Sequence, residues 1–516
     1  MSNNEPKTVN EALKGEDREK WKIAMESELS SMKDNQVWSL VERPTNKKVI
    51  SCKWVFKLKK GSDGNVSSYK ARLVACGFNQ REGEDYYETF SPVVRFESVR
   101  TILSLAAQFG LKVHQMDVST AFLNGNLQED VFMEQPIGCS TPNSKNLVCK
   151  LKKSIYGLKQ SPRCWNQNID GFLQELGFKR SDTDSCIYTS FINEKLCIVA
   201  IYVDDLIVAS ECCDVINKIK SCLSKRYKMK DLGKLEYFLG VKIDEKDSKI
   251  FLSQTVYAKE LLKRFGFDNS RPVSTPLEMG WKVESKEDSE DFEKEKYQAA
   301  VGGLLYLSTR TRPDLSFAVS CVARYCASPK MHHWVAVKRI FRYLKGTENM
   351  GLLYQKSTAL DCHGYSDADW AGSIDDRKST SGYCFSLGSG IISWRSSKQS
   401  CVSLSTAEAE YVALSAATQE AAWLHKLLGE LGHSTKNPIT IFEDNQAAIS
   451  LAYNPKDHSR TKHVQIKYHF VRDLVSKNVI KVQYCPTSIM LADIFTKPLA
   501  SERFKMIRSK LGLVEI

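Results

Sequence analysis

An apolar stretch near the middle of the chain, CIVAIYVDDLIVAS, is interrupted by two adjacent acids, Asp204 and Asp205. The β-branched and apolar residues on either side, LCIVAIYV and LIVAS, predict two buried strands. Burying two like charges without a partner is costly, so we expect the acids in the tight turn between the strands. Asp is common in turns for structural reasons alone, although this turn contains neither Gly nor Asn.

A second alternating pattern lies nearer the N-terminus. CKWVFKLKK predicts a strand, GSDGN a turn and SYKARLVACGF the returning strand of a hairpin. Nine basic residues and one acid lie between Lys47 and Arg81. Such a hairpin could bind a phosphate chain or a triphosphate, or it could simply present a solubilising face.

Two later segments change character. WKVESKEDSEDFEKEKY, from Trp281 to Tyr297, is dense in charge and predicts an exposed linker or loop. HHWVAVKRIFRYLKGT has apolar residues at helical spacing and predicts a helix that ends at Gly346. Its basic side would be a solvated face or a phosphate-binding face; the basic residues are Lys338, Arg339, Arg342 and Lys345.

Composition sets wider limits. A chain of 516 residues is too long for one core, and its net charge of +12 suggests an anionic partner. Its 16 cysteines, without a CxxC pair, indicate reduced thiols in a cytosolic or nuclear protein. The polar start does not resemble a signal peptide, and because there is no run of 18 apolar residues we expect no membrane span.

A third acid favours a metal site over a simple turn. Asp117 follows the alternating stretch LKVHQM and is expected at a strand end. Together with Asp204 and Asp205 it would supply the hard oxygen ligands that suit Mg²⁺. Two such ions could activate a primer hydroxyl and stabilise a departing pyrophosphate.

YKARLVACGFNQ, MDVSTAFLNG, SIYGLKQSPRCW and YVDD, in this order, resemble the reverse transcriptase of copia-type LTR retrotransposons. The resemblance implies a right-hand polymerase with fingers, palm and thumb. It implies Asp117, Asp204 and Asp205 as catalytic metal ligands, with Val118 as a further ligand. It also implies a primer-grip hairpin at LEYFLGVKI. The nucleotide-binding residues implied are Lys70, Arg72, Gln160 and Phe122, the last as a steric gate against a ribose 2′-hydroxyl.

The second half of the chain carries four further acids at predicted strand ends or helix starts: Asp367, Glu410, Asp444 and Asp493. Singly each is commonly a cap or a solvated residue, but as an ordered set they fit a two-metal nuclease. Glu408 is the rival of Glu410. Because Ser405 and Glu408 have capping-box spacing at the start of a long helix, we assign Glu408 to the cap and Glu410 to the site.

SDADWAG, STAEAEYVAL, EDNQAA and ADIFTK resemble the ribonuclease H domain that follows reverse transcriptase in these elements. The implied fold is a mixed five-stranded sheet with flanking helices. The same resemblance offers His463 as a catalytic residue near the scissile phosphate, with His458 and His469 as neighbours that leave the choice open.

The fold class predicted is therefore α/β (α+β), a right-hand polymerase followed by a ribonuclease H-like domain. The predicted segments are a polar N-terminal segment (1–20), the reverse transcriptase (21–275), a connection (276–360), the ribonuclease H-like domain (361–500) and a tail (501–516).

The predicted activities are RNA-directed DNA synthesis and hydrolysis of the RNA strand of hybrids, with two Mg²⁺ per active site and Mn²⁺ as an alternative. We expect an RNA template, a DNA primer, deoxynucleoside triphosphates and an RNA–DNA hybrid as partners, the hybrid held in part by Lys338, Arg339 and Arg342. A homodimer or an association with integrase is a further expectation. So is a location in cytoplasmic virus-like particles or the nucleus. Two alternatives remain: a domesticated or decayed element that binds nucleic acid without catalysis, and a single-activity enzyme in which only one half works.

Overall fold

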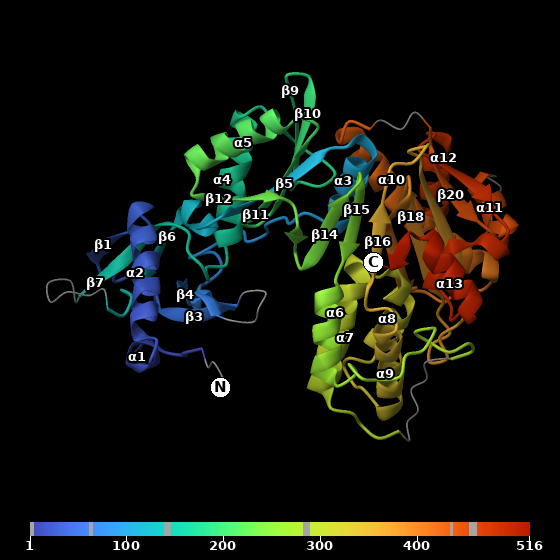
Figure 1. Cartoon of the computed structure of the whole chain (residues 1–516), viewed down its shortest axis with the longest axis horizontal. Coiled ribbons are helices and arrows are strands. Elements are labelled where there is room, and N and C mark those ends of the chain that lie inside the picture. Colours follow the sequence, from blue (N-terminus) through green and yellow to red (C-terminus); the bar gives the residue numbers. More distant parts are fainter. Residues whose placement is uncertain are drawn as a thin grey trace. The chain divides into compact units, whose positions relative to one another are not determined.

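Two units of the chain pack separately in the computed structural model, which describes residues 5–60, 66–138, 146–281, 289–433, 437–453 and 462–515 (Figure 1). Unit 1 comprises residues 1–94, 114–208 and 214–233, and unit 2 comprises residues 95–113, 209–213 and 234–516. No helix in the described part of the chain is long and apolar enough to cross a bilayer.

Unit 1 carries most of its candidate chemistry on strands. Its helices are α1 (Val9–Lys14), α2 (Arg18–Asp34), α4 (Ser161–Glu175), α5 (Cys213–Arg226) and the 3-10 turns η1 (Gly77–Asn79) and η2 (Ala121–Asn124). Its strands are β1 (Trp38–Glu42), β2 (Val49–Ile50), β3 (Cys52–Lys60), β4 (Val66–Ala75), β5 (Lys112–Val118), β6 (Asn126–Met133), β7 (Leu147–Lys153), β8 (Lys179–Arg180), β9 (Ile187–Ile192), β10 (Lys195–Tyr202), β11 (Asp205–Ser210) and β12 (Met229–Lys234).

The hydrophobic pattern of unit 1 is borne out in its strands. β3 and β4 pair antiparallel, as the alternation of CKWVFKLKK predicted, and their predicted turn lies outside the described residues. Helix α2 packs on β4, and its Trp21 meets Tyr69 of β4 and Phe56 of β3 edge to face. β10 and β11 are neighbours in a six-stranded sheet of order β12-β5-β11-β10-β9-β8. That order places β5, which carries Asp117, directly beside the hairpin that carries Asp204.

Unit 2 is built from helices α3 (Phe96–Phe109), α6 (Thr255–Phe265), α7 (Lys294–Arg310), α8 (Ser316–Ala323), α9 (Met331–Lys345), α10 (Thr406–Glu430), α11 (Gln446–Tyr453), α12 (Lys462–Ser476) and α13 (Ser501–Lys510), with the 3-10 turns η4 (Pro313–Leu315), η5 (Thr487–Ile489) and η6 (Leu491–Phe495). Its strands are β13 (Tyr237–Phe238), β14 (Val241–Lys246), β15 (Lys249–Ser253), β16 (Met350–Tyr354), β17 (Cys362–Ala368), β18 (Thr380–Leu387), β19 (Gly390–Lys398), β20 (Ile439–Glu443), β21 (Ile480–Tyr484) and β22 (Leu513–Glu515).

The C-terminal part of unit 2 contains the predicted mixed five-stranded sheet, in the order β19-β18-β17-β20-β21. β17, β18 and β19 pair antiparallel, whereas β20 runs parallel to both β17 and β21. Helix α10 lies along this sheet and contacts β17 and β18 (Figure 1). This topology confirms the predicted fold of the region.

The start of α10 separates the two rival glutamates. Ser405 is the N-cap, and its Oγ accepts the Glu408 N–H at 3.2 Å. The Glu408 carboxylate in turn accepts the Leu404 N–H at 2.8 Å, one residue before the Ser405 N–H that a capping box would use, so the predicted box is present in part. Glu408 is therefore used by the helix terminus, and Glu410 is left for the site.

The hairpin predicted from LEYFLGVKI is present as β13 and β14. Its turn has left-handed backbone at Leu239 (φ 49°) and Gly240 (φ 74°). A Cβ on Gly240 would lie 2.1 Å from the Tyr306 hydroxyl, so glycine is needed both for its backbone and for this close approach. Whether the hairpin grips a primer stays a prediction.

Three predicted boundaries differ in the structure. The charged stretch 281–297 is not a loop throughout, because α7 begins at Lys294 and Tyr297 is completely buried. Helix α2 crosses the boundary drawn at residue 20. The proposed tail, 501–516, contains α13 and β22, and β22 extends a sheet by pairing with β16. Charge density and terminal position misled here, because tertiary packing supplied apolar partners that lie far away in the sequence.

Candidate active sites

The first acidic site lies at one end of the six-stranded sheet of unit 1. Asp204 occupies the turn between β10 and β11, Asp205 begins β11, and Asp117 is the penultimate residue of β5. The Val118 N–H donates to the Asp204 carbonyl at 2.8 Å and so ties β5 to the hairpin tip. Val118, whose side chain is buried, could reach a metal only through its own main-chain carbonyl.

Neighbouring side chains hold the hairpin tip. Val203 adopts a left-handed backbone (φ 55°), which is strained for a β-branched residue. The Trp165 indole N–H donates to the Val203 carbonyl at 2.7 Å, and Gln115 Nε2 donates to Asp205 Oδ1 at 3.1 Å. Sequence reasoning missed Trp165 and Gln115, which support the turn from α4 and β5.

The charges of Asp117 and Asp204 act on Asp205, although these three acids are less tightly grouped than the acids of unit 2. Burial raises the pKa of Asp205, the Gln115 hydrogen bond lowers it, and the charges of Asp204 and Asp117 raise it again. Among the described residues, the compact three-acid group with mutually close oxygens is in unit 2 and not here. The three carboxylates Asp117, Asp204 and Asp205 form a donor set that suits a hard divalent cation.

Two of the predicted nucleotide-binding residues, Arg72 and Phe122, contact a residue that the sequence patterns did not single out, Tyr156. The Phe122 and Tyr156 ring centroids lie 4.9 Å apart in an edge-to-face arrangement, and the Arg72 guanidinium lies 4.6 Å from the Tyr156 ring centroid. Arg72 Nε is buried without a hydrogen-bond partner in the described structure. The motif SIYGLKQSP was the available signal for Tyr156.

Lys70 borders a cavity of about 450 Å³ between α2 and β4. The cavity is also lined by Lys20, Lys228, Ser119 and Thr120, so ammonium and hydroxyl groups dominate its polar lining. Burial lowers the pKa of Lys70, as does nearby Arg72. Such a lining is chemically suited to an anionic group next to Asp117.

Gln160 is placed differently from its predicted role beside nucleotide and template. Its side chain is buried, where it accepts from Gln80 at 3.0 Å and donates to the Asp85 carbonyl at 2.8 Å. Its amide therefore holds neighbouring segments of protein in this structure. A direct contact with a nucleotide would require these bonds to open.

Helix α9 has the predicted buried face, with Val337, Phe341 and Leu344 inaccessible to solvent. Its basic face is less free than the sequence suggested. Arg339 forms a 2.6 Å ion pair with Glu278, and Arg342 Nε donates to the Arg271 carbonyl at 2.8 Å. Arg339 and Arg342 therefore already have partners within unit 2. The third predicted phosphate-binding residue is Lys338.

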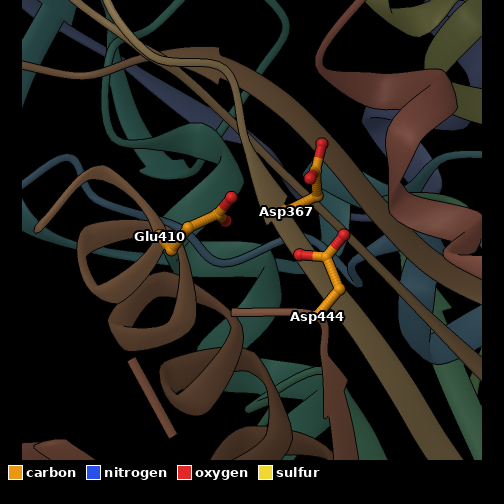
Figure 2. Close-up of side chains that lie close together, drawn as sticks. All are labelled: Asp367, Glu410 and Asp444. Atoms are coloured by element: carbon orange, nitrogen blue, oxygen red, sulfur yellow. The ribbon is translucent and has the colours of Figure 1, made fainter. Parts of the chain in front are cut away.

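The second acidic site lies on the mixed sheet of unit 2. Asp367 comes from β17, Glu410 from α10 and Asp444 directly follows β20, and the three side chains lie close together in Figure 2. One carboxylate oxygen of each lies within 4.8 Å of the other two. We call these three residues the acidic cluster. The structure thus brings together three of the four acids predicted for a nuclease.

The fourth acid, Asp493, lies next to the acidic cluster and is paired with bases. Lys497 Nζ lies 2.7 Å from Asp493 Oδ1 and 3.5 Å from Asp367 Oδ2, and Arg503 also pairs with Asp493. Thr496 donates its hydroxyl proton to Asp367. Lys497 was not predicted as a site residue, although it follows Asp493 by four residues in the segment ADIFTK.

Burial leaves the acidic cluster poorly compensated. It raises the pKa of Asp367 to about 6 in spite of the nearby Lys497, and it raises the pKa of Glu410 well above its usual value. Glu410 Oε2 is buried and has no hydrogen-bond partner in the described structure. Buried carboxylate oxygens without partners are the donor set expected of a divalent-cation site.

The histidine predicted near the scissile phosphate cannot be placed. His463 belongs to α12, but its side chain lies outside the described residues, and His458 lies outside them entirely. His469 is described and is exposed on α12. The role of His463 stays a prediction.

Comparisons with known proteins identify relatives of both halves of the chain. Residues 35–279 match the family described as reverse transcriptase (RNA-dependent DNA polymerase). The chain is 42% identical over 518 residues to the retrovirus-related Pol polyprotein from transposon TNT 1-94 of Nicotiana tabacum, covering 99% of this chain but 39% of that relative. It is 32% identical over 307 residues to a putative transposon Ty5-1 protein of Saccharomyces cerevisiae, covering 59% of this chain and all of that relative. A solved foamy viral protease-reverse transcriptase in complex with RNA/DNA hybrid shares 12% identity at a TM-score of 0.47, over 90% of this chain and 54% of that one.

Proposed function

Because the chain belongs to the reverse transcriptase family of copia-type retrotransposon Pol polyproteins, we propose that it couples RNA-directed DNA synthesis in unit 1 to ribonuclease H cleavage in unit 2. The observation that carries the proposal is the acidic cluster on a mixed five-stranded sheet, in the same chain as a polymerase-family domain with its own convergent aspartates. The chain spans 39% of the tobacco relative, so the proposal extends only to the chemistry of units 1 and 2.

In the polymerase, Asp117, Asp204 and Asp205 would hold two Mg²⁺ or Mn²⁺ ions. The ions would supply the positive charge that lowers the pKa of the primer hydroxyl and braces the departing pyrophosphate. Gln115 orients Asp205, and Trp165 holds the strained turn that presents Asp204.

Substrate binding would fall to the residues around Tyr156. Lys70 and Arg72 would bind the triphosphate. The Tyr156 ring packs against the Arg72 guanidinium and meets the Phe122 ring edge to face. Phe122 would then lie under the sugar and exclude a 2′-hydroxyl by direct collision. Gln160 would act by fixing Gln80 and the backbone at Asp85.

In the nuclease, Asp367, Glu410, Asp444 and Asp493 would hold Mg²⁺, whose positive charge would favour attack of water on the phosphodiester. Thr496 and Lys497 orient Asp367, and Lys497 also pairs with Asp493. His463 would assist near the scissile phosphate.

The partners we propose are the RNA template, the DNA primer, deoxynucleoside triphosphates and the RNA–DNA hybrid. Phosphate contacts, which are largely independent of sequence, would dominate hybrid binding. We propose further that the protein works in cytoplasmic virus-like particles or in the nucleus, as a homodimer or with integrase.

Paired assays test both activities on the same preparation. Primer extension on a poly-rA template and cleavage of a labelled RNA–DNA hybrid should both occur. Asp204→Asn or Asp117→Asn should abolish extension and leave cleavage largely intact, whereas Asp444→Asn should do the reverse. Extension retained in either polymerase variant would remove those residues from the site. Hybrid binding without either activity in the unmodified chain would favour the non-catalytic alternative.

A further inference from the structure

Adjacent strands place a fifth carboxylate behind the acidic cluster. β17 and β20 run parallel, with Tyr365 opposite Phe442, so Asp367 and Asp444 come two residues later on the same face. The residues directly before and after each of these acids along its strand point to the opposite face of the sheet. Ala368 packs there against Ala409 and Ala413 of α10, so this face is the one that α10 covers. Glu443, one residue before Asp444, points to the α10 side.

Glu443 is fully buried and only half satisfied. Its Oε1 accepts the Asn445 N–H at 3.3 Å, but its Oε2 has no hydrogen-bond partner in the described structure. Glu410 Oε2 is in the same condition. Glu410 comes from α10, the helix that covers this face, so the two glutamates lie on the same side of the sheet.

Packing at the end of β20 does not by itself require a glutamate whose second carboxylate oxygen has no hydrogen-bond partner in the described structure. Burying a carboxylate oxygen without a partner is unfavourable. The Asn445 N–H contact at the start of α11 is long, and a further backbone hydrogen bond comes from Asp444, but a neutral glutamine oxygen could accept both equally well. The negative charge itself is thus unexplained by the packing around it.

We propose that Glu443 is a positioning residue for the divalent-cation site, an inner carboxylate that raises the site's cation affinity from the α10 side. Its oxygens are not among those of the acidic cluster, so it acts through its charge and through the orientation of Glu410. The inference rests on the proposed ribonuclease H site and extends it beyond the four acids predicted from the sequence.

Calorimetric titration of the full chain with Mn²⁺, without nucleic acid, tests the inference. An Asp204→Asn parent is used throughout to weaken cation binding in unit 1. Adding Glu443→Gln should weaken Mn²⁺ binding in unit 2 about 10- to 100-fold, the usual effect of losing an outer partner of metal ligands. The same change should not lower the Tm in EDTA, because it replaces a buried carboxyl group that has a partner on one oxygen only by an amide of nearly the same shape. Glu443→Asp, which keeps the charge, should retain most of the affinity.

Glu420→Gln is the matched control. Glu420 is a largely buried glutamate on α10, whereas Glu443 ends β20. The Ser393 hydroxyl donates to the Glu420 carboxylate at 2.6 Å, so replacing Glu420 should leave the Mn²⁺ affinity unchanged. If Glu443→Gln leaves the Mn²⁺ affinity unchanged while Asp444→Asn still abolishes binding, the inference about Glu443 is overturned and the proposed ribonuclease H site is not. Binding that Asp444→Asn does not alter would overturn the site as well. A lower Tm in EDTA for Glu443→Gln would show that the residue is a structural one.

Discussion

Lys497 Nζ lies 2.7 Å from Asp493 Oδ1, and the same nitrogen reaches Asp367 Oδ2 at 3.5 Å. One ammonium group therefore partly neutralises two buried carboxylates that come from separate segments. Burial lowers the pKa of Lys497, but the charges of Asp367 and Asp493 outweigh it and raise that pKa above its usual range. Lys497 thus provides an internal positive charge where a divalent cation would be bound.

Lys497→Met should destabilise the metal-free chain. Losing one partner of a buried pair costs about 1–3 kcal/mol, and the lower end is expected because the Lys497 side chain is 38% exposed and partly screened by water. Saturating Mn²⁺ should shrink the loss, since the ion replaces the missing charge. Thermal denaturation with and without Mn²⁺ measures both effects. Lys505→Met, at an exposed pair with Glu502, should change neither Tm. A loss of equal size in both conditions would contradict the idea.

The acidity of Asp367 predicts a pH dependence of stability. Its folded-state pKa of about 6 lies above the ordinary value of 3.8, so between these values the folded chain binds more protons than the unfolded chain. The contribution to stability is therefore fully present below about pH 4 and is lost as pH rises through about 6, by up to about 3 kcal/mol.

Denaturant unfolding of the metal-free chain at pH 4 to 7, compared with Asp367→Asn, isolates this contribution. The variant should lose part of the fall, while the part due to Asp369, whose pKa is also raised to about 6, should remain. In saturating Mn²⁺ the slope should reverse, because the ion binds the ionised carboxylate. A stability difference between the two proteins that does not vary with pH would contradict the prediction.

Phe122→Ala should raise ribonucleotide incorporation relative to deoxyribonucleotide incorporation, because it removes the proposed collision with the 2′-hydroxyl. Deoxynucleotide use should fall much less. The measurement is the ratio of kcat/KM for a ribonucleotide and its deoxy counterpart. If Phe122 is only a packing partner of Tyr156, truncation should cost roughly 3–5 kcal/mol of stability and depress both substrates together, leaving the ratio unchanged.

On helix α9, Lys338→Ala should lower the slope of log affinity against log salt for hybrid binding by about one unit, the value for a single phosphate contact. Arg339→Ala and Arg342→Ala should have smaller effects, because Glu278 and the Arg271 carbonyl already occupy those guanidinium groups. Binding titrations from low to moderate salt provide the slopes. Equal effects at all three positions would show that the internal partners are released when the hybrid binds.

Local patterns were sufficient wherever the physics is local. The alternation around Trp54 marked β3, the spacing of Ser405 and Glu408 marked the start of α10, and the cost of burying adjacent charges put Asp204 in a turn. Each outcome depends on residues within a few positions of one another. The same reasoning separated Glu410 from Glu408 before any packing was known.

Only the tertiary structure decided which distant groups share an environment. Lys497 beside Asp367, Tyr156 between Arg72 and Phe122, and the orphaned oxygen of Glu443 all depend on strand order and register. The same is true of Gln160 and Arg339, whose side chains look available in sequence and are bonded within the fold. Burial and pairing set the free energy of a charged group, and both are properties of neighbours that the chain brings together from far apart.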